Sequence, residues 1–311
     1  MKPERRGAAE VGWAALKLGL TSFGGPIAHI GYFREEYVQR RKWLDEPAFA
    51  DLAALCQFLP GPASSQLGIA IGMRRAGQLV PLALCGLFGL RWLRPESSGA
   101  ESEAAHPPLR LSASACALAL FAALLVALPL WTALHPSPAA RLIDGAYRAG
   151  SLVFGGGHVV LPMLRRDVVG PGLLSDAQFV AGYGMTQAVP GPLFTFAAYI
   201  GAASASGRTS LARAAAMLIA IFLPSFLLVV GTLPLWTRLR ANRHARGALA
   251  GVNAGVVGLL AAALYDPVWT GTVAGSADFA AALALFVLLT AWKCPPWALV
   301  LLGAGIGAAA F

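Results

Sequence analysis

The sequence predicts an all-α, polytopic membrane protein of about eight to ten membrane segments, built from two homologous halves with broken or re-entrant helices and a shortened first half. Of its 311 residues, 57% are hydrophobic and only 13% are charged, with a mean hydropathy of +0.64. Soluble domains carry roughly 25% charged residues, so this chain has too few charges to cover a soluble surface. Two motifs also recur in the same order, and glycine and proline interrupt apolar sequence at both.

Apolar runs that approach or reach bilayer-spanning length, about 20 residues, are concentrated in the second half. They cover residues 111–131, 211–236, 247–264 and 280–292, with a final hairpin completed by residues 297–311 after Pro295-Pro296. The first half holds one modest run, residues 79–90, before a polar linker. The expected division is therefore a shortened first half at 1–110 with the linker at 94–110, a connecting transmembrane helix at 111–140, and a second half at 141–311.

The formal net charge of +9 comes from short basic clusters between apolar runs, such as Arg40-Arg41-Lys42 and Arg165-Arg166. This distribution is typical of cytoplasmic loops under the positive-inside rule, and it argues against a nucleic-acid-binding protein. The first ten residues carry both signs of charge and show no cleavage site after an apolar core. We therefore expect no removable signal peptide, and the first membrane segment would act as an uncleaved signal.

An internal repeat is the most informative feature of the sequence. Residues 17–33 align with residues 148–164 through the pattern basic-x-Gly-x-x-x-Phe-Gly-Gly. The alignment pairs Lys17 with Arg148, Gly19 with Gly150, Phe23 with Phe154, Gly24 with Gly155, and Gly25 with Gly156. Such glycine pairs let a chain turn sharply and let backbone N–H groups face a ligand.

A second block repeats the pattern Gln-x-x-Pro-Gly-Pro, at residues 57–62 and 187–192. It pairs Gln57 with Gln187, Pro60 with Pro190, Gly61 with Gly191, and Pro62 with Pro192. The offsets of the two blocks differ by one residue, which indicates duplication rather than chance. Between the blocks, Asp45 in the first half and Ser175 in the second are typical helix caps.

Each motif allows a structural and a functional interpretation. A half-helix that starts at Phe-Gly-Gly would offer free N–H donors and a positive dipole end to an anion. Small residues also let membrane helices pack closely, which is the structural alternative. Lys17 and Arg148 lie inside apolar sequence, where a cation could bind an oxyanion or extend its charged group to the membrane interface. The Pro-Gly-Pro segments are interpreted as kinks or hinges.

Histidine and glutamine side chains accompany these motifs. His29 and His158 follow their glycines closely without being equivalent in the repeat, and each could line a site, carry a coupled proton, or only make a structural hydrogen bond. Gln57 and Gln187 could contact a neighbouring helix or donate to a substrate. The candidate substrate-binding residues are Lys17, Phe23, Gly24, Gly25, His29, Gln57, Pro60, Gly61, Arg148, Phe154, Gly155, Gly156, His158, Gln187, Pro190 and Gly191.

Signatures of catalysis are absent from the sequence. It contains no Gly-x-Ser-x-Gly, no phosphate-binding loop, no His-Glu-x-x-His and no cysteine or histidine cluster with metal-ligand spacing. We therefore expect no enzyme, cofactor or metal site. Without a nucleotide-binding motif, transport energy would come from an ion gradient, and Asp51 is one acid that could take part in proton coupling.

The motif regions resemble the chromate transporter family. The segment TSFGGPIAHIGYFREEYVQRRKWLDEPAFADLAALCQFLPGP is similar to the family's signature half, and GSLVFGGGHVVLPMLRRDVV with GYGMTQAVPGPLF is similar to its second half. The resemblance implies a multi-pass bacterial inner-membrane protein with halves in opposite orientation. It also implies export of chromate, a sulfate-like oxyanion, coupled to protons. A homodimer is among the possible assemblies.

One departure from the family pattern raises an alternative. Family members with both halves are longer, and the missing stretch falls between Gly77 and about residue 111. The chain could therefore be a transport-inactive membrane scaffold left by an internal deletion. Transport by the chain as it stands would exclude this alternative.

Overall fold

A computed structural model describes residues 8–23, 25–76, 111–154, 157–236 and 264–310, together with the single residues 242, 247, 251 and 261. Within these ranges the chain is helical and contains no strand, which confirms the all-α fold class for the described part. The apolar run at 79–90, the polar linker at 94–110 and most of the run at 247–264 lie outside the described residues.

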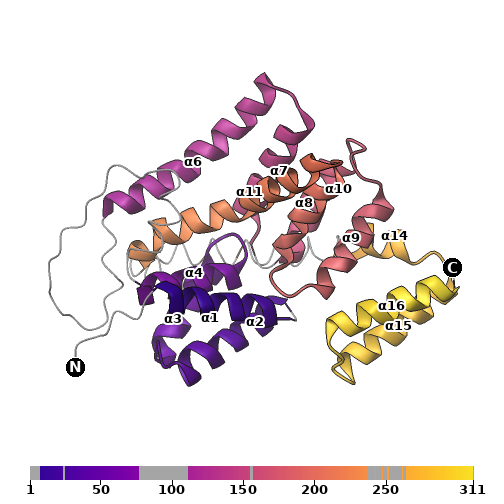
Figure 1. Cartoon of the computed structure of the whole chain (residues 1–311), viewed down its shortest axis with the longest axis horizontal. Coiled ribbons are helices and arrows are strands. Elements are labelled where there is room, and N and C mark those ends of the chain that lie inside the picture. Colours follow the sequence, from indigo (N-terminus) through magenta and orange to yellow (C-terminus); the bar gives the residue numbers. More distant parts are fainter. Residues whose placement is uncertain are drawn as a thin grey trace.

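The first half forms helices that are interrupted at its two motifs (Figure 1). Its elements are α1 (Ala8–Thr21), α2 (Gly25–Arg34), the π-helical turn η1 (Glu35–Arg40), α3 (Glu46–Phe58) and α4 (Ala63–Ala76). The Phe-Gly-Gly motif separates α1 from α2, and the Pro-Gly-Pro motif separates α3 from α4. The Asp45 side chain accepts the backbone N–H of Ala48 at 2.9 Å, so the predicted cap of α3 is confirmed.

The second half repeats this order of elements with breaks at the same motif positions. Its elements are α7 (Pro138–Leu152), the 3-10 turn η2 (Gly157–Val159), α8 (Val160–Val168), α9 (Asp176–Ala188), the 3-10 turn η3 (Leu193–Thr195) and α10 (Phe196–Ala203). Ser175 and Gln178 form a reciprocal capping box at the start of α9, which confirms the second predicted cap.

Among the described residues, two helices have the length and apolar composition to cross a membrane, α6 (Leu111–Leu134) and α11 (Arg208–Thr232), which η4 (Leu233–Leu235) extends. Both exceed the length of about 20 residues that a bilayer requires. Near the C-terminus, η5 (Leu264–Trp269) and α14 (Thr270–Thr272) precede the expected hairpin of α15 (Ser276–Thr290) and α16 (Pro296–Ala310). In Figure 1 this hairpin lies beside the second half.

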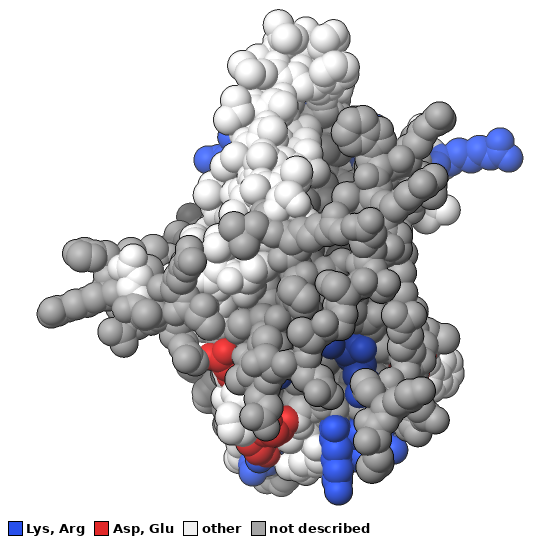
Figure 2. Space-filling model, turned by 90° about the vertical axis from the view of Figure 1, so that its left-hand side faces the viewer, with Lys and Arg blue, Asp and Glu red and all other residues white. Residues whose placement is uncertain are grey.

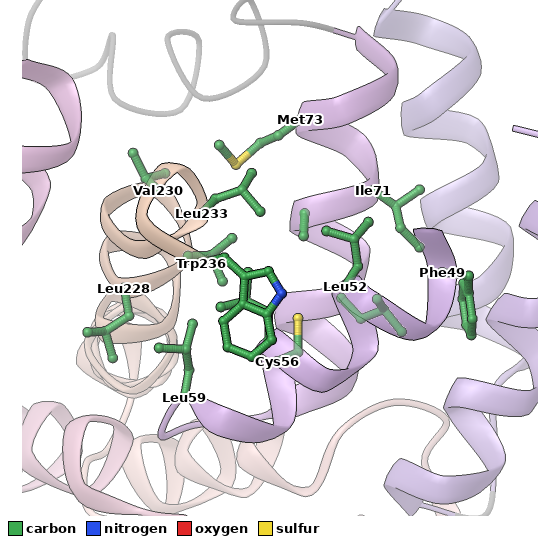
Figure 3. Close-up of a cluster of buried hydrophobic side chains, with 14 of the residues drawn as sticks. Phe49, Leu52, Cys56, Leu59, Ile71, Met73, Leu228, Val230, Leu233 and Trp236 are labelled. Atoms are coloured by element: carbon green, nitrogen blue, oxygen red, sulfur yellow. The ribbon is translucent and has the colours of Figure 1, made fainter. Parts of the chain in front are cut away.

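Helix α11 packs into the cores of both halves. Its residues Met217, Ala220 and Ile221 belong to the buried cluster of α7–α10. The buried cluster built by α1, α3 and α4 includes residues 227–230 of α11, and also Leu233 and Trp236 in and after η4. Figure 3 shows Leu228 and Val230 of α11, with Leu233 of η4 and Trp236 directly after it, among side chains of α3 and α4. One continuous helix therefore joins the two halves.

Glycines allow α11 to approach its neighbours closely. A methyl group on Gly150 of α7 or on Gly201 of α10 would overlap backbone atoms of α11, and one on Gly231 of α11 would overlap Leu118 of α6. Lipid is as apolar as a leucine side chain, so close packing at small residues is a main source of helix association in a membrane. The structural interpretation of the repeat's glycine therefore holds at Gly150.

The outer face of α6 suits a lipid environment. Leu120, Val126, Leu130 and Trp131 are exposed on it, and the helix contains no charged residue. In Figure 2, the visible acidic side chains lie toward the lower end of the face together with several basic ones, and further basic side chains lie at the upper left and the upper right. An exposed apolar helix without charge, such as α6, is expected of a protein that contacts a bilayer.

Candidate functional site

The motif breaks of the two halves bind each other through the backbone. The N–H of Gly61, in the first Pro-Gly-Pro, donates to the carbonyl of Val153 at 2.6 Å. The N–H of Gly191, in the second Pro-Gly-Pro, donates to the carbonyl of Ser22 at 3.0 Å. Ser22 and Val153 each directly precede the phenylalanine of a Phe-Gly-Gly motif. The two hydrogen bonds are therefore equivalent in the repeat, as halves related by a pseudo-twofold axis would produce.

Both Pro-Gly-Pro loops adopt the same glycine-dependent backbone. The φ angle is +114° at Gly61 and +119° at Gly191, a region that residues with a Cβ rarely occupy. Prolines on both sides fix the neighbouring φ angles and remove N–H groups that could extend a helix. The sequence therefore dictates a rigid reversal at this point in each half, which aims one glycine N–H at the opposite half.

The two loops differ in what surrounds them. Gly61 is buried, and a methyl group there would overlap Ser225 Oγ of α11 and lie 3.0 Å from Gln66 Nε2. Gly191 is half-buried, and a methyl group there would meet no described atom within 4 Å. The junction is thus symmetric in its backbone hydrogen bonds and asymmetric in its packing.

Buried polar side chains gather around the first-half loop. Gln66 Nε2 donates to the Pro60 carbonyl at 2.6 Å, and His29 Nδ1 lies 3.3 Å from Ser64 Oγ. Among the described residues, Ser225 Oγ, Gln66 Oε1 and His29 Nε2 are buried without a hydrogen-bond partner. Buried polar atoms in proteins are nearly always paired, so unpaired ones mark places where water or a ligand can bind. The motif analysis did not single out Gln66 or Ser225, because neither belongs to a repeated position.

The two repeated cations are held by carboxylates. Lys17 Nζ lies 3.3 Å from Glu36 Oε2, and Arg148 Nη2 lies 2.8 Å from Asp144 Oδ2. Both cationic side chains are 38% exposed, while the two carboxylates are almost fully buried. Each cation is therefore neither isolated in apolar surroundings nor fully extended into solvent.

Glu36, in the first turn of η1, is the centre of a larger charge network. Besides Lys17, it accepts hydrogen bonds from Arg40 at 2.9 Å and Arg41 at 2.7 Å, and Arg41 also reaches Glu10 at 3.3 Å. Burial alone would raise the pKa of the Glu36 carboxyl, but the hydrogen bonds from Arg41 and Lys17 outweigh it and hold the pKa below its ordinary value. The network therefore places three cations on Glu36, one of which also binds Glu10.

The other candidate residues differ in burial and in the element that carries them. Phe23 and Phe154 are half-buried at the breaks, and Gly25 begins α2. Gln57 is exposed on α3, whereas Gln187 is half-buried on α9, as is Pro190 after it. Gly24, Gly155 and Gly156 lie outside the described residues, as does the side chain of His158, whose backbone is in η2.

Comparison with known proteins assigns this sequence to a family. The sequence model of the chromate transporter family matches the chain twice, at residues 9–145 and 140–308. The chain belongs to the chromate transporter family. The two matches agree with the repeated elements, and a transporter family together with two helices of spanning length makes this a membrane protein.

Relatives in the family carry transport names. A chromate transport protein of Pseudomonas aeruginosa is 30% identical over an alignment of 368 positions, which covers 89% of this chain and 86% of the relative. A probable chromate transport protein of Synechococcus elongatus is 25% identical over 80% of this chain and 81% of the relative. The first alignment is longer than this chain and therefore contains gaps opposite part of the relative. No solved structure matches.

Proposed function

We propose that this chain is a secondary transporter that exports chromate or a similar sulfate-like oxyanion across the bacterial inner membrane, with protons as the coupling ion. The observation that carries the proposal is the reciprocal junction, in which Gly61 and Gly191 each bind the break of the opposite half. Transporters built from repeats place their substrate sites where interrupted helices meet at the repeat interface. The names of the P. aeruginosa and S. elongatus relatives supply the substrate class.

The chemistry around the junction suits a tetrahedral oxyanion. Such an anion accepts hydrogen bonds at every oxygen, and the starts of interrupted helices offer free N–H groups and a positive dipole end. Gly25 begins α2 and Ala63 begins α4, so both first-half breaks lead into such a helix start. The guanidinium of Arg148 adds donors that can bind two oxygens at once.

The remaining candidates fall into two roles under this proposal. Pro60, Gly61, Pro190 and Gly191 position the junction rather than touch the anion, because their prolines lack N–H groups and their glycine N–H groups are used across the halves. The Phe-Gly-Gly residues, His29 and His158 line the route that the anion follows.

The experiment is uptake of labelled chromate and labelled sulfate into inside-out membrane vesicles that contain the chain. We expect chromate to accumulate inside the vesicles and excess sulfate to reduce this accumulation. Imposing a proton gradient should change the amount of chromate that accumulates, and an unchanged amount would contradict proton coupling. Vesicles that contain the Gly150→Ala variant serve as a control, because a methyl group there would overlap the carbonyl of Ile221 and separate α7 from α11.

Growth in chromate gives an independent measurement. Cells that express the chain should accumulate less chromate and tolerate more of it than cells with an empty vector. If the chain is well expressed and inserted yet neither vesicles nor cells show chromate movement, the transport proposal fails and the inactive-scaffold alternative is supported.

A further inference from the structure

The second half contains a buried carboxylate that the motif analysis did not identify. Asp144 lies on α7, one turn before Arg148, and its side chain is only 5% exposed. Its Oδ2 binds Arg148 at 2.8 Å, while its Oδ1 is buried and has no hydrogen-bond partner among the described residues. Arg148 Nε is unpaired in the same way. An ionised carboxylate with one oxygen buried and unpaired is costly, and protonation of that oxygen removes the charge.

A second carboxylate approaches Asp144 from α8. A methyl group on Gly145 would overlap the carboxylate of Asp167, so Asp167 lies directly against the turn of α7 that carries Asp144. Arg166 binds the outer oxygen of Asp167 at 3.2 Å. The other helices packed on α7 offer little charge, because α6 has no charged residue and α11 has only Arg208 and Arg213, with Arg213 bound to the Ser204 carbonyl.

The first half differs at the equivalent positions. Trp13 occupies the repeat position of Asp144, and Glu36 that of Asp167. Glu36 is surrounded by three cations, Lys17, Arg40 and Arg41. The second half instead has two neighbouring carboxylates that each pair with one arginine, Asp144 with Arg148 and Asp167 with Arg166. Of these equivalent sites, only the second-half one has a carboxylate oxygen that is buried without a hydrogen-bond partner in the described structure, Asp144 Oδ1.

We propose that Asp144 binds a proton together with the transported oxyanion, and that Arg148 is the group through which the two events are coupled. The inference rests on the proposed function, because it takes the anion to bind at Arg148. With Asp144 ionised, the guanidinium is neutralised and a dianion would meet two carboxylates. When a proton adds to Asp144 Oδ1, one negative charge disappears and Arg148 becomes available to the oxyanion.

This coupling has a defined sign. Anything that makes Asp144 easier to protonate makes the anion bind more tightly, and the bound anion in turn favours the proton, because linkage is reciprocal. For one coupled proton, affinity rises by up to about tenfold for each pH unit of acidification. Proton binding and oxyanion binding are therefore positively coupled.

The test is equilibrium binding of radiolabelled chromate to the purified full-length chain between roughly pH 6 and pH 8. We expect wild-type affinity to rise on acidification. Asp144→Asn imitates the protonated carboxyl, so it should bind at neutral pH about as tightly as the wild type binds in acid and lose most of the pH dependence. Protonation of chromate itself affects both proteins equally, so the difference between them reports Asp144.

Three further variants make the test specific. Asp144→Glu should restore the pH dependence. Asp167→Asn should move it to lower pH, because removal of a neighbouring negative charge makes Asp144 harder to protonate. Asp176→Asn, which removes only the exposed partner of Arg165, should behave as wild type. If Asp144→Asn does not fold, the shift in Asp167→Asn carries the test.

The outcomes separate this inference from the proposed function. If the wild type binds neither chromate, sulfate nor molybdate at any pH, the proposed function fails and the inference with it. If the wild type binds chromate but folded Asp144→Asn keeps the wild-type pH dependence or binds nothing, the inference alone is overturned. An unshifted pH profile in Asp167→Asn would also count against it.

Discussion

The two Pro-Gly-Pro glycines form a natural matched pair for mutation. Gly61→Ala and Gly191→Ala impose the same backbone strain, because their φ angles are +114° and +119°. Such strain costs about 1–3 kcal/mol at each site. Only at Gly61 does the added methyl group also overlap Ser225 Oγ and press on Gln66 Nε2. Overpacking of this kind costs about a further 1–3 kcal/mol.

The expected result is that Gly61→Ala destabilises the protein by about 2–6 kcal/mol and Gly191→Ala by about 1–3 kcal/mol. The free energy of unfolding, measured by denaturant titration in detergent, provides the comparison. Chromate flux in vesicles measures whether the junction tolerates each change. Because the strain is common to both variants, the difference between them isolates the contacts at Gly61 with Ser225 of α11 and Gln66 of α4.

A double mutant checks the assigned cause. Ser225→Gly removes the hydroxymethyl group that the new methyl would overlap, so Gly61→Ala combined with Ser225→Gly should recover much of the additional loss. Coupling between residues in contact is typically about 0.5–3 kcal/mol. Equal losses in the two alanine variants, or additive losses in the double mutant, would refute the packing argument.

Three other predictions concern packing and charge. Gly150→Ala should disrupt the packing of α7 on α11, because its methyl group would overlap the Ile221 carbonyl. Gly19→Ala, at the equivalent repeat position, should fold normally because the space around Gly19 is open. The yield of monodisperse protein is the measurement for both variants. Leu233→Ala should lower the free energy of unfolding by about 2–5 kcal/mol, since Leu233 is buried in the first-half core. Because the pKa of Glu36 is lowered in the folded protein, its ionised carboxylate stabilises the fold above its ordinary pKa, and this stabilisation is lost as the pH falls through the folded-state pKa. Glu36→Gln should therefore lose less stability on acidification than the wild type. Melting temperature measured against pH provides the comparison.

The elements of the fold that are local in sequence could be predicted from it. Glycine and proline act on the backbone where they stand, so the breaks at Phe-Gly-Gly and Pro-Gly-Pro and the caps at Asp45 and Ser175 followed from residue chemistry alone. The repeat then predicted that both halves would share one order of elements, which the structure shows.

The partners of these elements could not be predicted in the same way. Which carboxylate holds Lys17 depends on η1 turning back toward α1, and Glu36 lies 19 residues away. Ser225 lies in the middle of an apolar helix and becomes notable only because α11 crosses Gly61. Asp144 has Trp13 as its repeat counterpart, so a comparison that looks for shared residues passes over it. Residues that differ between the two halves could therefore be identified only from their contacts in the three-dimensional structure.

The course of α11 has a consequence for how the protein is made. The first-half core includes residues 227–230 of α11 and Leu233 of η4, so it cannot be completed when α1–α4 leave the ribosome. Domains commonly fold in turn as they are synthesised, N-terminal part first. Here α1–α4 remain incompletely packed, with part of their apolar surface uncovered by α11, until much of the second half has been translated. Translation that stops before α11 would leave a first half without its final packing partner and open to proteolysis.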